Sequence, residues 1–191
     1  MAATLPVPIE FSLPEGWRAA PPDEVGAPGV AFAALAPGQV EGFIGNITIS
    51  GDYRDDHADL PAIADESVDR LERSAVVHVA DRTLVGTEQA PGLTQRLDIA
   101  TTVNGNPVDL VQCQVYLELR DVAEPRRRVI VELALTSTRG DFGGLVGDFQ
   151  EFVRGIRTPE GEQRDEQQTD QPREPQPRPA PRHTRASGEN S

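Results

Sequence analysis

Two long runs of alternating apolar residues, separated by the turn Asn104-Gly105-Asn106-Pro107, constrain the fold of this chain most strongly. The apolar positions are Leu93, Leu97, Ile99 and Val103 in the first run and Val111, Cys113, Val115, Leu117 and Leu119 in the second. An apolar residue at every second position is typical of a strand with one buried face. Both rows are odd-numbered, so a three-residue loop over 104–106 would put them on the same face, with Ile99 opposite Val111. Leu97 would then lie opposite Cys113, and we predict this register.

Shorter stretches of the same alternation predict further strands. They are residues 9–13, ending at the turn Pro14-Glu15-Gly16 before the only tryptophan, Trp17; residues 30–35 and 43–49, joined as a hairpin through Pro37-Gly38; residues 76–87; and residues 129–135. The turn residues Pro and Gly between these stretches mark their ends. The sequence therefore predicts a sheet built mainly from antiparallel strands.

Two amphipathic helices are predicted from apolar residues at spacings of three and four. The first covers residues 60–71, with Pro61 in its first turn and Arg70 near its end. The second covers residues 142–156 and carries a stripe of three phenylalanines. It also contains Gly143, Gly144, Gly147 and Gly155. Each glycine weakens a helix by about 1 kcal/mol relative to alanine, so we expect packing to hold this helix, with the glycines permitting a close approach to the sheet.

The composition changes sharply after Thr158. Residues 159–191 contain no Val, Ile, Leu, Phe, Trp or Tyr and are rich in Pro, Gln, Glu and Arg. Such a segment cannot bury enough apolar surface to offset the entropy lost on ordering. We therefore expect one folded domain over residues 1–158 and a disordered tail over residues 159–191.

The net charge and the lack of long apolar stretches argue against several classes of function. The formal net charge of -13 opposes binding to nucleic acid and to anionic membrane surfaces. Residues 1–8 lack the basic and apolar regions of an export signal, and no stretch reaches the roughly 18 apolar residues of a membrane span. We expect a cytoplasmic protein without stable membrane insertion.

Residues with the chemistry for catalysis or metal binding are few. No pair among the three histidines has metal-ligand spacing, and no phosphate loop or nucleophile motif is present, so we expect no cofactor and no resident metal. The acidic loop of residues 52–59 could collect a divalent cation; its candidate ligands are Asp52, Asp55, Asp56, His57 and Asp59. The run Arg126-Arg127-Arg128 could attract an acidic ligand, or could be a solvated turn.

The order of elements resembles that of a known superfamily. The residues that carry the resemblance are Phe11-Ser12-Leu13-Pro14-Glu15-Gly16-Trp17, Gly45-Asn46-Ile47-Thr48-Ile49 and the phenylalanine-rich final helix. Over residues 5–157 the chain resembles the superfamily of the photosystem protein PsbP and the nuclear-transport factor Mog, with its bacterial LpqN, DcrB and Eag-chaperone branches. The resemblance implies an α+β fold, in which an antiparallel sheet of about six to seven strands is flanked by helices as an α/β/α sandwich. It also implies protein binding and not catalysis.

Chaperones of that superfamily receive partner helices on a sheet face. The even-numbered face of the central strands here offers the predicted partner-binding residues Arg96, Gln112, Gln114, Tyr116 and Ile130. Gln and Tyr could hydrogen-bond small polar groups of a partner helix. The alternative is that one of the protein's own helices covers this face.

Three functions follow from these patterns. The first is a non-catalytic protein-binding module, a cytoplasmic adaptor or chaperone for a secreted or membrane-active protein, such as a carrier of a hydrophobic helix of a secreted effector. The second is a small-ligand or metal-dependent enzyme that uses His57 and the acidic loop of residues 52–59. The third is an interaction scaffold that acts through its Pro/Arg-rich tail.

Overall fold

The computed structural model describes residues 3–38, 42–120 and 128–158. The described residues belong to a compact unit, Met1–Pro159, and a separate unit begins at Glu160. The predicted disordered tail, and Arg126 and Arg127 of the arginine run, lie outside the described residues.

One antiparallel sheet dominates the described domain. Its seven strands follow the order β1-β2-β3-β7-β6-β5-β4. They are β1 (Arg18–Ala20), β2 (Phe32–Leu35), β3 (Asn46–Arg54), β4 (Val76–Gly86), β5 (Pro91–Val103), β6 (Asn106–Arg120) and β7 (Arg128–Thr138). β2 and β3 confirm the predicted hairpin, and β4 and β7 confirm the strands predicted from residues 76–87 and 129–135.

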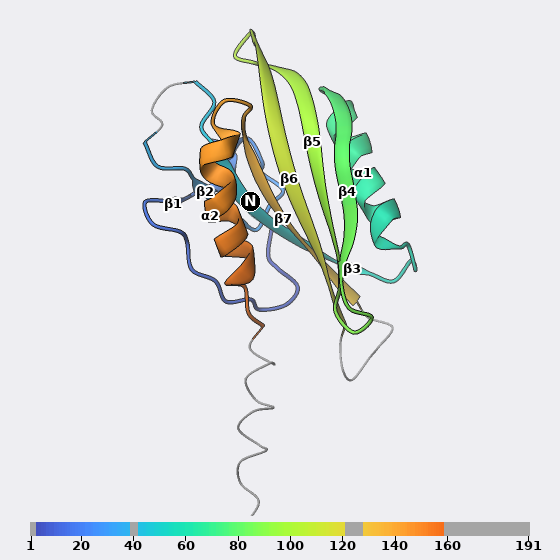
Figure 1. The fold of residues 1–191 in the computed structure, drawn as a ribbon. Helices are drawn as coiled ribbons and strands as arrows, with labels where there is room; N and C mark the ends of the chain where they lie inside the picture. Colours follow the sequence, from blue (N-terminus) through green and yellow to red (C-terminus); the bar gives the residue numbers. More distant parts are fainter. Residues whose placement is uncertain (1–2, 39–41, 121–127, 159–191) are drawn as a thin grey trace, which may run out of the picture. The chain divides into compact units, whose positions relative to one another are not determined.

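Two helices cover opposite faces of the sheet (Figure 1). α1 (Leu60–Glu72) lies beside β4 and β5, and α2 (Phe142–Arg154) packs against β7 from the other side. A short 3-10 helix, η1 (Pro22–Val25), follows β1. In α1 the carboxylate of Asp59 accepts a hydrogen bond from the backbone N–H of Ala62 at 2.9 Å, and so caps the helix start. The predicted α+β sandwich and both predicted helices are confirmed.

The register predicted for the hairpin of β5 and β6 is wrong by one residue. Val103 pairs with Asn106, so the loop has two residues, Asn104 and Gly105, both with positive φ. An Asn-Gly pair in this conformation forms the tight turn that suits the twist of a hairpin. Consequently Ile99 lies opposite Leu110, and the odd-numbered apolar rows of the two strands face opposite sides of the sheet.

The strand predicted at residues 9–13 is also absent as a sheet strand. Only one isolated bridge, from Glu10 to Arg157, forms there, and the first sheet strand is β1. The apolar side chains of this segment, Phe11 among them, pack directly against the core beneath α2. The predicted turn does form, because Gly16 has a φ of 80° and the N–H of Trp17 bonds to the carbonyl oxygen of Pro14.

Trp17 anchors this amino-terminal segment to α2. Its side chain is buried in the core, and its indole Nε1 donates a hydrogen bond of 2.8 Å to Asp148 Oδ2 on α2. A buried tryptophan with its N–H bonded combines apolar burial with a fixed orientation. Trp17 therefore packs the amino-terminal segment against the core and fixes it to α2.

The two faces of the sheet have different cores. Beneath α2 one apolar cluster contains Phe149 and Phe152 together with the inward rows of β3 and β7. Beneath α1 there are two smaller clusters, one around Leu60, Ile63 and Tyr116 and another around Leu97 and Leu110.

The close approach expected of the α2 glycines is not found. A Cβ atom built on Gly143, Gly144 or Gly147 would meet nothing within 4 Å, and all three residues are exposed. These glycines therefore lie on the solvent side of α2, where they weaken the helix without improving its packing.

Candidate functional site

The most distinctive surface of the domain is a half-covered apolar row on β6. Cys113, Val115 and Leu117 face the same side of the sheet as α2, but α2 lies over β7 and leaves this row only partly buried. On the same face, the neighbouring positions of β5 carry small or polar residues, including Gly92 and Thr94. The apolar row therefore has α2 on one side only.

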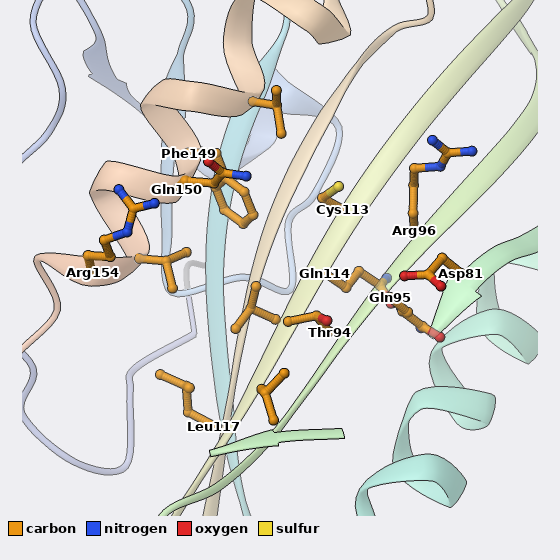
Figure 2. A pocket seen from close by; sticks show the side chains of 14 residues that line it. Asp81, Thr94, Gln95, Arg96, Cys113, Gln114, Leu117, Phe149, Gln150 and Arg154 are labelled. Carbon is orange, nitrogen blue, oxygen red and sulfur yellow. The ribbon is translucent and has the colours of Figure 1, made fainter. Parts of the chain in front are cut away.

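A groove of about 740 Å³ runs along this row between α2 and strands β4 and β5 (Figure 2). We call it the α2 groove; it is lined by Asp81, Val85, Thr94, Gln95, Arg96, Cys113, Gln114, Val115, Leu117, Val146, Phe149, Gln150, Val153 and Arg154. Its volume is within the range of protein pockets that bind drug-sized ligands. Its apolar floor and wall suit an occupant with apolar groups.

Two arginines stand on opposite sides of the α2 groove. Arg154 comes from the last turn of α2, and Arg96 projects from β5. Both are exposed, and neither guanidinium has an ion-pair partner within the part of the chain that the structure describes. Asp81 is the only acidic residue lining the groove, and it lies opposite Arg96 in the register of β4 and β5. The rim of the groove is thus locally positive on an acidic protein.

Cys113, the only cysteine of the chain, lies in the groove. Burial raises the pKa of its thiol, and the positive charge of Arg96 offsets this only in part. The thiol is therefore protonated at neutral pH and a weak nucleophile. It is useful as a single reporter group inside the groove.

The structure does not bring the five predicted partner-binding residues together. Because the hairpin register pairs odd with even positions, Arg96 lies on the α2 side, whereas Gln112, Gln114, Tyr116 and Ile130 lie on the α1 side. The prediction of a common face is wrong for Arg96. Gln114 and Tyr116 are each only 1% exposed, and Ile130 is also buried beneath α1. These buried side chains cannot contact a partner while α1 is in place.

Gln114 is the centre of a hydrogen-bond network beneath α1. Its Oε1 accepts hydrogen bonds from the amide of Gln95 and from the hydroxyl of Tyr116, at 2.5 and 2.8 Å. Its Nε2 donates to Ser67 at 3.1 Å and to Gln112 at 2.7 Å. Every donor and acceptor position of this buried amide is therefore used. The arrangement explains these polar residues as parts of the core.

Glu132 lies beside this network on β7. Burial raises the pKa of its carboxyl group above the ordinary value of 4.5, and the charge of Arg70 opposes that rise. The two charged groups are 3.6 Å apart. Burial, followed by the nearby charge of Glu132, also raises the pKa of Tyr116. The α1 side therefore contains an acid whose charged form is disfavoured by its surroundings.

The acidic loop of residues 52–59 is organised around Arg54. Its guanidinium pairs with Asp56 at 2.5 Å and with Glu66 at 2.7 Å, and hydrogen bonds from Arg54 lower the pKa of both carboxyl groups. Asp59 is used as the cap of α1. Among the described residues, no group of three or more His, Cys, Asp or Glu side chains is placed to hold a metal ion.

Arg128, the described member of the arginine run, is largely buried. Its Nη1 donates to Glu118 Oε2 at 3.3 Å, and its Nη2 donates to the carbonyl oxygen of Ala58. Both side chains of this ion pair are mostly buried. The ion pair joins the start of β7 to β6, and the hydrogen bond to Ala58 joins it to the loop before α1. Arg128 thus has a structural role at this position.

Comparison with known proteins identifies the fold but no sequence family. No protein-family model matches the chain, and no curated protein matches it. The crystal structure of LpqN, involved in cell envelope biogenesis of Mycobacterium tuberculosis, is similar with a TM-score of 0.56 at 12% identity, over 79% of this chain and 83% of that one. The solution structure of cyanobacterial PsbP (CyanoP) from Synechocystis is similar with a TM-score of 0.51 at 11% identity, over 78% and 86% of the two chains. The domain has a PsbP-like fold.

Of the predicted partner-binding residues, only Arg96 and Gln114 line the α2 groove of this PsbP-like domain. The sequence pattern places Val146, Val153 and Arg154 on a helix and Val85 on a strand, but it does not indicate that these residues meet. The Asn104-Gly105 turn was the available signal, because a two-residue loop separates the apolar rows of β5 and β6 onto different faces. No helix among the described residues is long and apolar enough to cross a membrane.

Proposed function

We propose that this PsbP-like domain is a non-catalytic protein-binding module, a cytoplasmic adaptor or chaperone for a secreted or membrane-active protein. Its binding site is the α2 groove, and the occupant is an apolar segment of the partner flanked by acidic residues. The observation that carries the proposal is the half-covered apolar row of β6 set between the two unpaired arginines, Arg96 and Arg154.

Apolar contact supplies the affinity in this proposal. Burial of apolar surface contributes about 25 cal/mol per Å², and an amphipathic helix seated in a groove buries its apolar stripe while its polar side stays in water. Val115, Leu117 and Val153 would contact that stripe. The half-buried state of these residues means that part of their surface is still available to a partner.

Charge selects the partner and its orientation. Arg96 and Arg154 on opposite sides of the groove favour carboxylates at both margins of the occupant, and repel lysine at the same positions. Arginine also forms two parallel hydrogen bonds to one carboxylate, which fixes direction as well as position.

A pair of designed peptides tests the proposal. One is a helical peptide with a leucine stripe flanked by glutamates, and the other has lysine in place of every glutamate. We expect the full-length chain to bind the acidic peptide at least about tenfold more tightly, and the double variant Arg96→Glu/Arg154→Glu to reverse this preference. Arg73→Glu is the matched control, since Arg73 is an exposed arginine at the end of α1.

The rate at which Cys113 reacts with a thiol reagent locates the binding. Bound acidic peptide should slow the reaction, because Cys113 lies in the groove. A charge reversal at Arg96 and Arg154 that changes peptide affinity no more than Arg73→Glu does, or an unchanged thiol rate with peptide bound, would exclude this groove. Partner capture is also compared between the full-length chain and a chain that lacks residues 159–191. If removing these residues abolishes capture, binding is assigned to the tail and not to the α2 groove.

A further inference from the structure

β4 is a long, unpaired edge of the sheet. It spans Val76–Gly86 at one end of the strand order, whereas the opposite edge, β1, has only three residues. Among the described residues, no strand pairs with the outer side of β4 (Figure 1). Alternate backbone N–H and C=O groups along such an edge have no sheet partner, and proteins commonly protect long edges from pairing.

Exposed apolar side chains concentrate on this edge. The described residues include four large hydrophobic side chains that are exposed, and three of them are on β4: Val76 (74%), Leu84 (64%) and Val85 (41%). Single exposed apolar residues are ordinary on a protein surface, but three on one free strand make this edge a candidate contact surface.

A bulge in the middle of β4 decides which faces these side chains occupy. The register against β5 shifts between Val79 and Asp81, so residue parity changes there. Before the bulge Val76 lies on the α2 side of the sheet, and after it Val85 lies on the same side. Val77, opposite Ile99, and Leu84, opposite Leu93, both lie on the α1 side.

We propose that the partner of the β4 edge is a second copy of this chain, paired antiparallel about a two-fold axis between Ala80 and Asp81. In this register Val76 lies opposite Val85 of the second copy, and Val77 lies opposite its Leu84. Each of these pairs occurs twice, and both members of a pair project to the same face. A two-fold arrangement closes on itself, so both β4 edges are paired with each other and no β4 edge is left for a third copy.

The self-complementary order of side chains favours a second copy over an unrelated strand. Moving the register by two residues in one direction places Val76 opposite Thr83 and Val77 opposite Arg82, which loses the apolar pairs. Near the axis, each Asp81 has Arg96 directly opposite it on β5, so a positive charge lies beside each acidic group that the pairing brings together. The proposal holds whatever occupies the α2 groove, but Asp81, Val85 and Arg96 also line that groove, so the tests below substitute neither Arg96 nor Arg154.

Disulfide cross-linking tests the register directly. In the full-length chain with Cys113→Ser, we mix the variants Val76→Cys and Val85→Cys under mildly oxidising conditions. Directly opposed strand positions have Cα atoms about 4.5–5.5 Å apart, within the range that a disulfide spans. The two copies of residue 76 would instead be separated by the strand length from 76 to 85, about 30 Å. We therefore expect at least about tenfold more covalent dimer from the mixture than from either variant alone.

Mass measurement by light scattering provides the second test. The unmodified chain should approach twice its monomer mass as concentration rises, and Val76→Lys/Leu84→Lys should raise the dimer dissociation constant at least about tenfold. Thr102→Lys, at an exposed position of β5, is the control and should leave the dimer unchanged. A monomer mass up to about 0.5 mM, or equal cross-linking of Val76→Cys alone, would overturn the proposal; circular dichroism checks that each variant is folded.

Discussion

The two faces of the sheet are covered by helices of equal length, yet they are stabilised in different ways. Beneath α2 the buried side chains are apolar and form one cluster with Phe149, Phe152 and the rows of β3 and β7. Beneath α1 the apolar clusters are interrupted by Gln95, Gln114 and Tyr116, which hydrogen-bond to one another. The α2 side therefore depends on filled volume, and the α1 side depends on the geometry of its polar contacts.

This difference determines how each face tolerates substitution. An apolar core tolerates a change of shape if the volume is kept, whereas a network tolerates a change of volume only if each donor retains an acceptor. The polar face also fixes one register, since Gln114 reaches all four partners from a single position. Five substitutions test the contrast, from the largest expected effect to the smallest.

Phe152→Ala should have the largest effect. Phe152 is 2% exposed and its ring packs edge-on against Phe11, so its removal leaves a cavity beneath α2. We expect a loss of about 4 kcal/mol in the free energy of unfolding, measured with urea. Phe152→Leu, which keeps more of the volume, should cost less than half as much; an equal cost would mean that volume does not govern this face.

Gln114→Met should follow, at a loss of about 3 kcal/mol. The volume is kept, but Tyr116 and Gln95 lose their buried acceptor, and such groups cost about 1–3 kcal/mol each when unsatisfied. Gln112→Met is the control at the half-buried end of the network, where we expect about 1 kcal/mol. If both variants are as stable as the original chain in urea unfolding, the α1 side does not depend on its network.

Glu132→Gln should stabilise the domain at neutral pH. Burial raises the folded pKa of Glu132 above 4.5, so the native state binds a proton that the unfolded chain releases. Its contribution is therefore most favourable below pH 4.5 and declines as pH rises through the folded pKa. The difference between the original chain and Glu132→Gln in urea unfolding should follow this decline.

Glu66→Gln provides the opposite sign. The hydrogen bond from Arg54 lowers the pKa of Glu66, so this carboxylate contributes stability above its unfolded pKa and loses it as pH falls through the folded value. Glu66 is largely exposed, and we expect only a small effect. Stability differences with the same sign for Glu132 and Glu66 would contradict the assignment of the buried acid.

Gly147→Ala should give the smallest change, a gain of up to about 1 kcal/mol. The added Cβ meets nothing within 4 Å, and alanine is the better helix former. Gly92→Ala is the contrasting control, because a Cβ there would lie 3.0 Å from the carbonyl oxygen of Tyr116. Thermal unfolding of both variants should show a rise for the first and a fall for the second.

Much of the architecture was predictable because it depends on local patterns. α1 follows from its apolar spacing, the capping residue Asp59 and Pro61, and β7 follows from the apolar residues at its odd-numbered positions. The failures concern relations between elements. The register prediction assumed that two odd-numbered apolar rows share one core, but helices cover both faces of this sheet, so each row finds its own core.

The same cause hid the candidate site. The α2 groove forms because α2 packs over β7 and does not cover β5. The position of a helix over a sheet depends on how many side chains pack together, so no single sequence motif predicts it. Residues 9–13 show a related limit, since their alternation places apolar side chains against the core while the backbone forms only one isolated bridge, from Glu10 to Arg157. The similarity to LpqN and CyanoP identifies the fold, whereas the α2 groove is a feature of this structure.

The exposed glycines of α2 make the two sides of the α2 groove differ in local stability. β5, β6 and β7 form a continuous hydrogen-bonded sheet, whereas α2 is held mainly by one apolar stripe and has low intrinsic helicity. Elements of this kind open locally more often than the sheet that supports them, which hydrogen exchange of the α2 amides would register as low protection. We therefore expect α2 to move more readily than the sheet beneath it, which would let the proposed site accept apolar segments of different width.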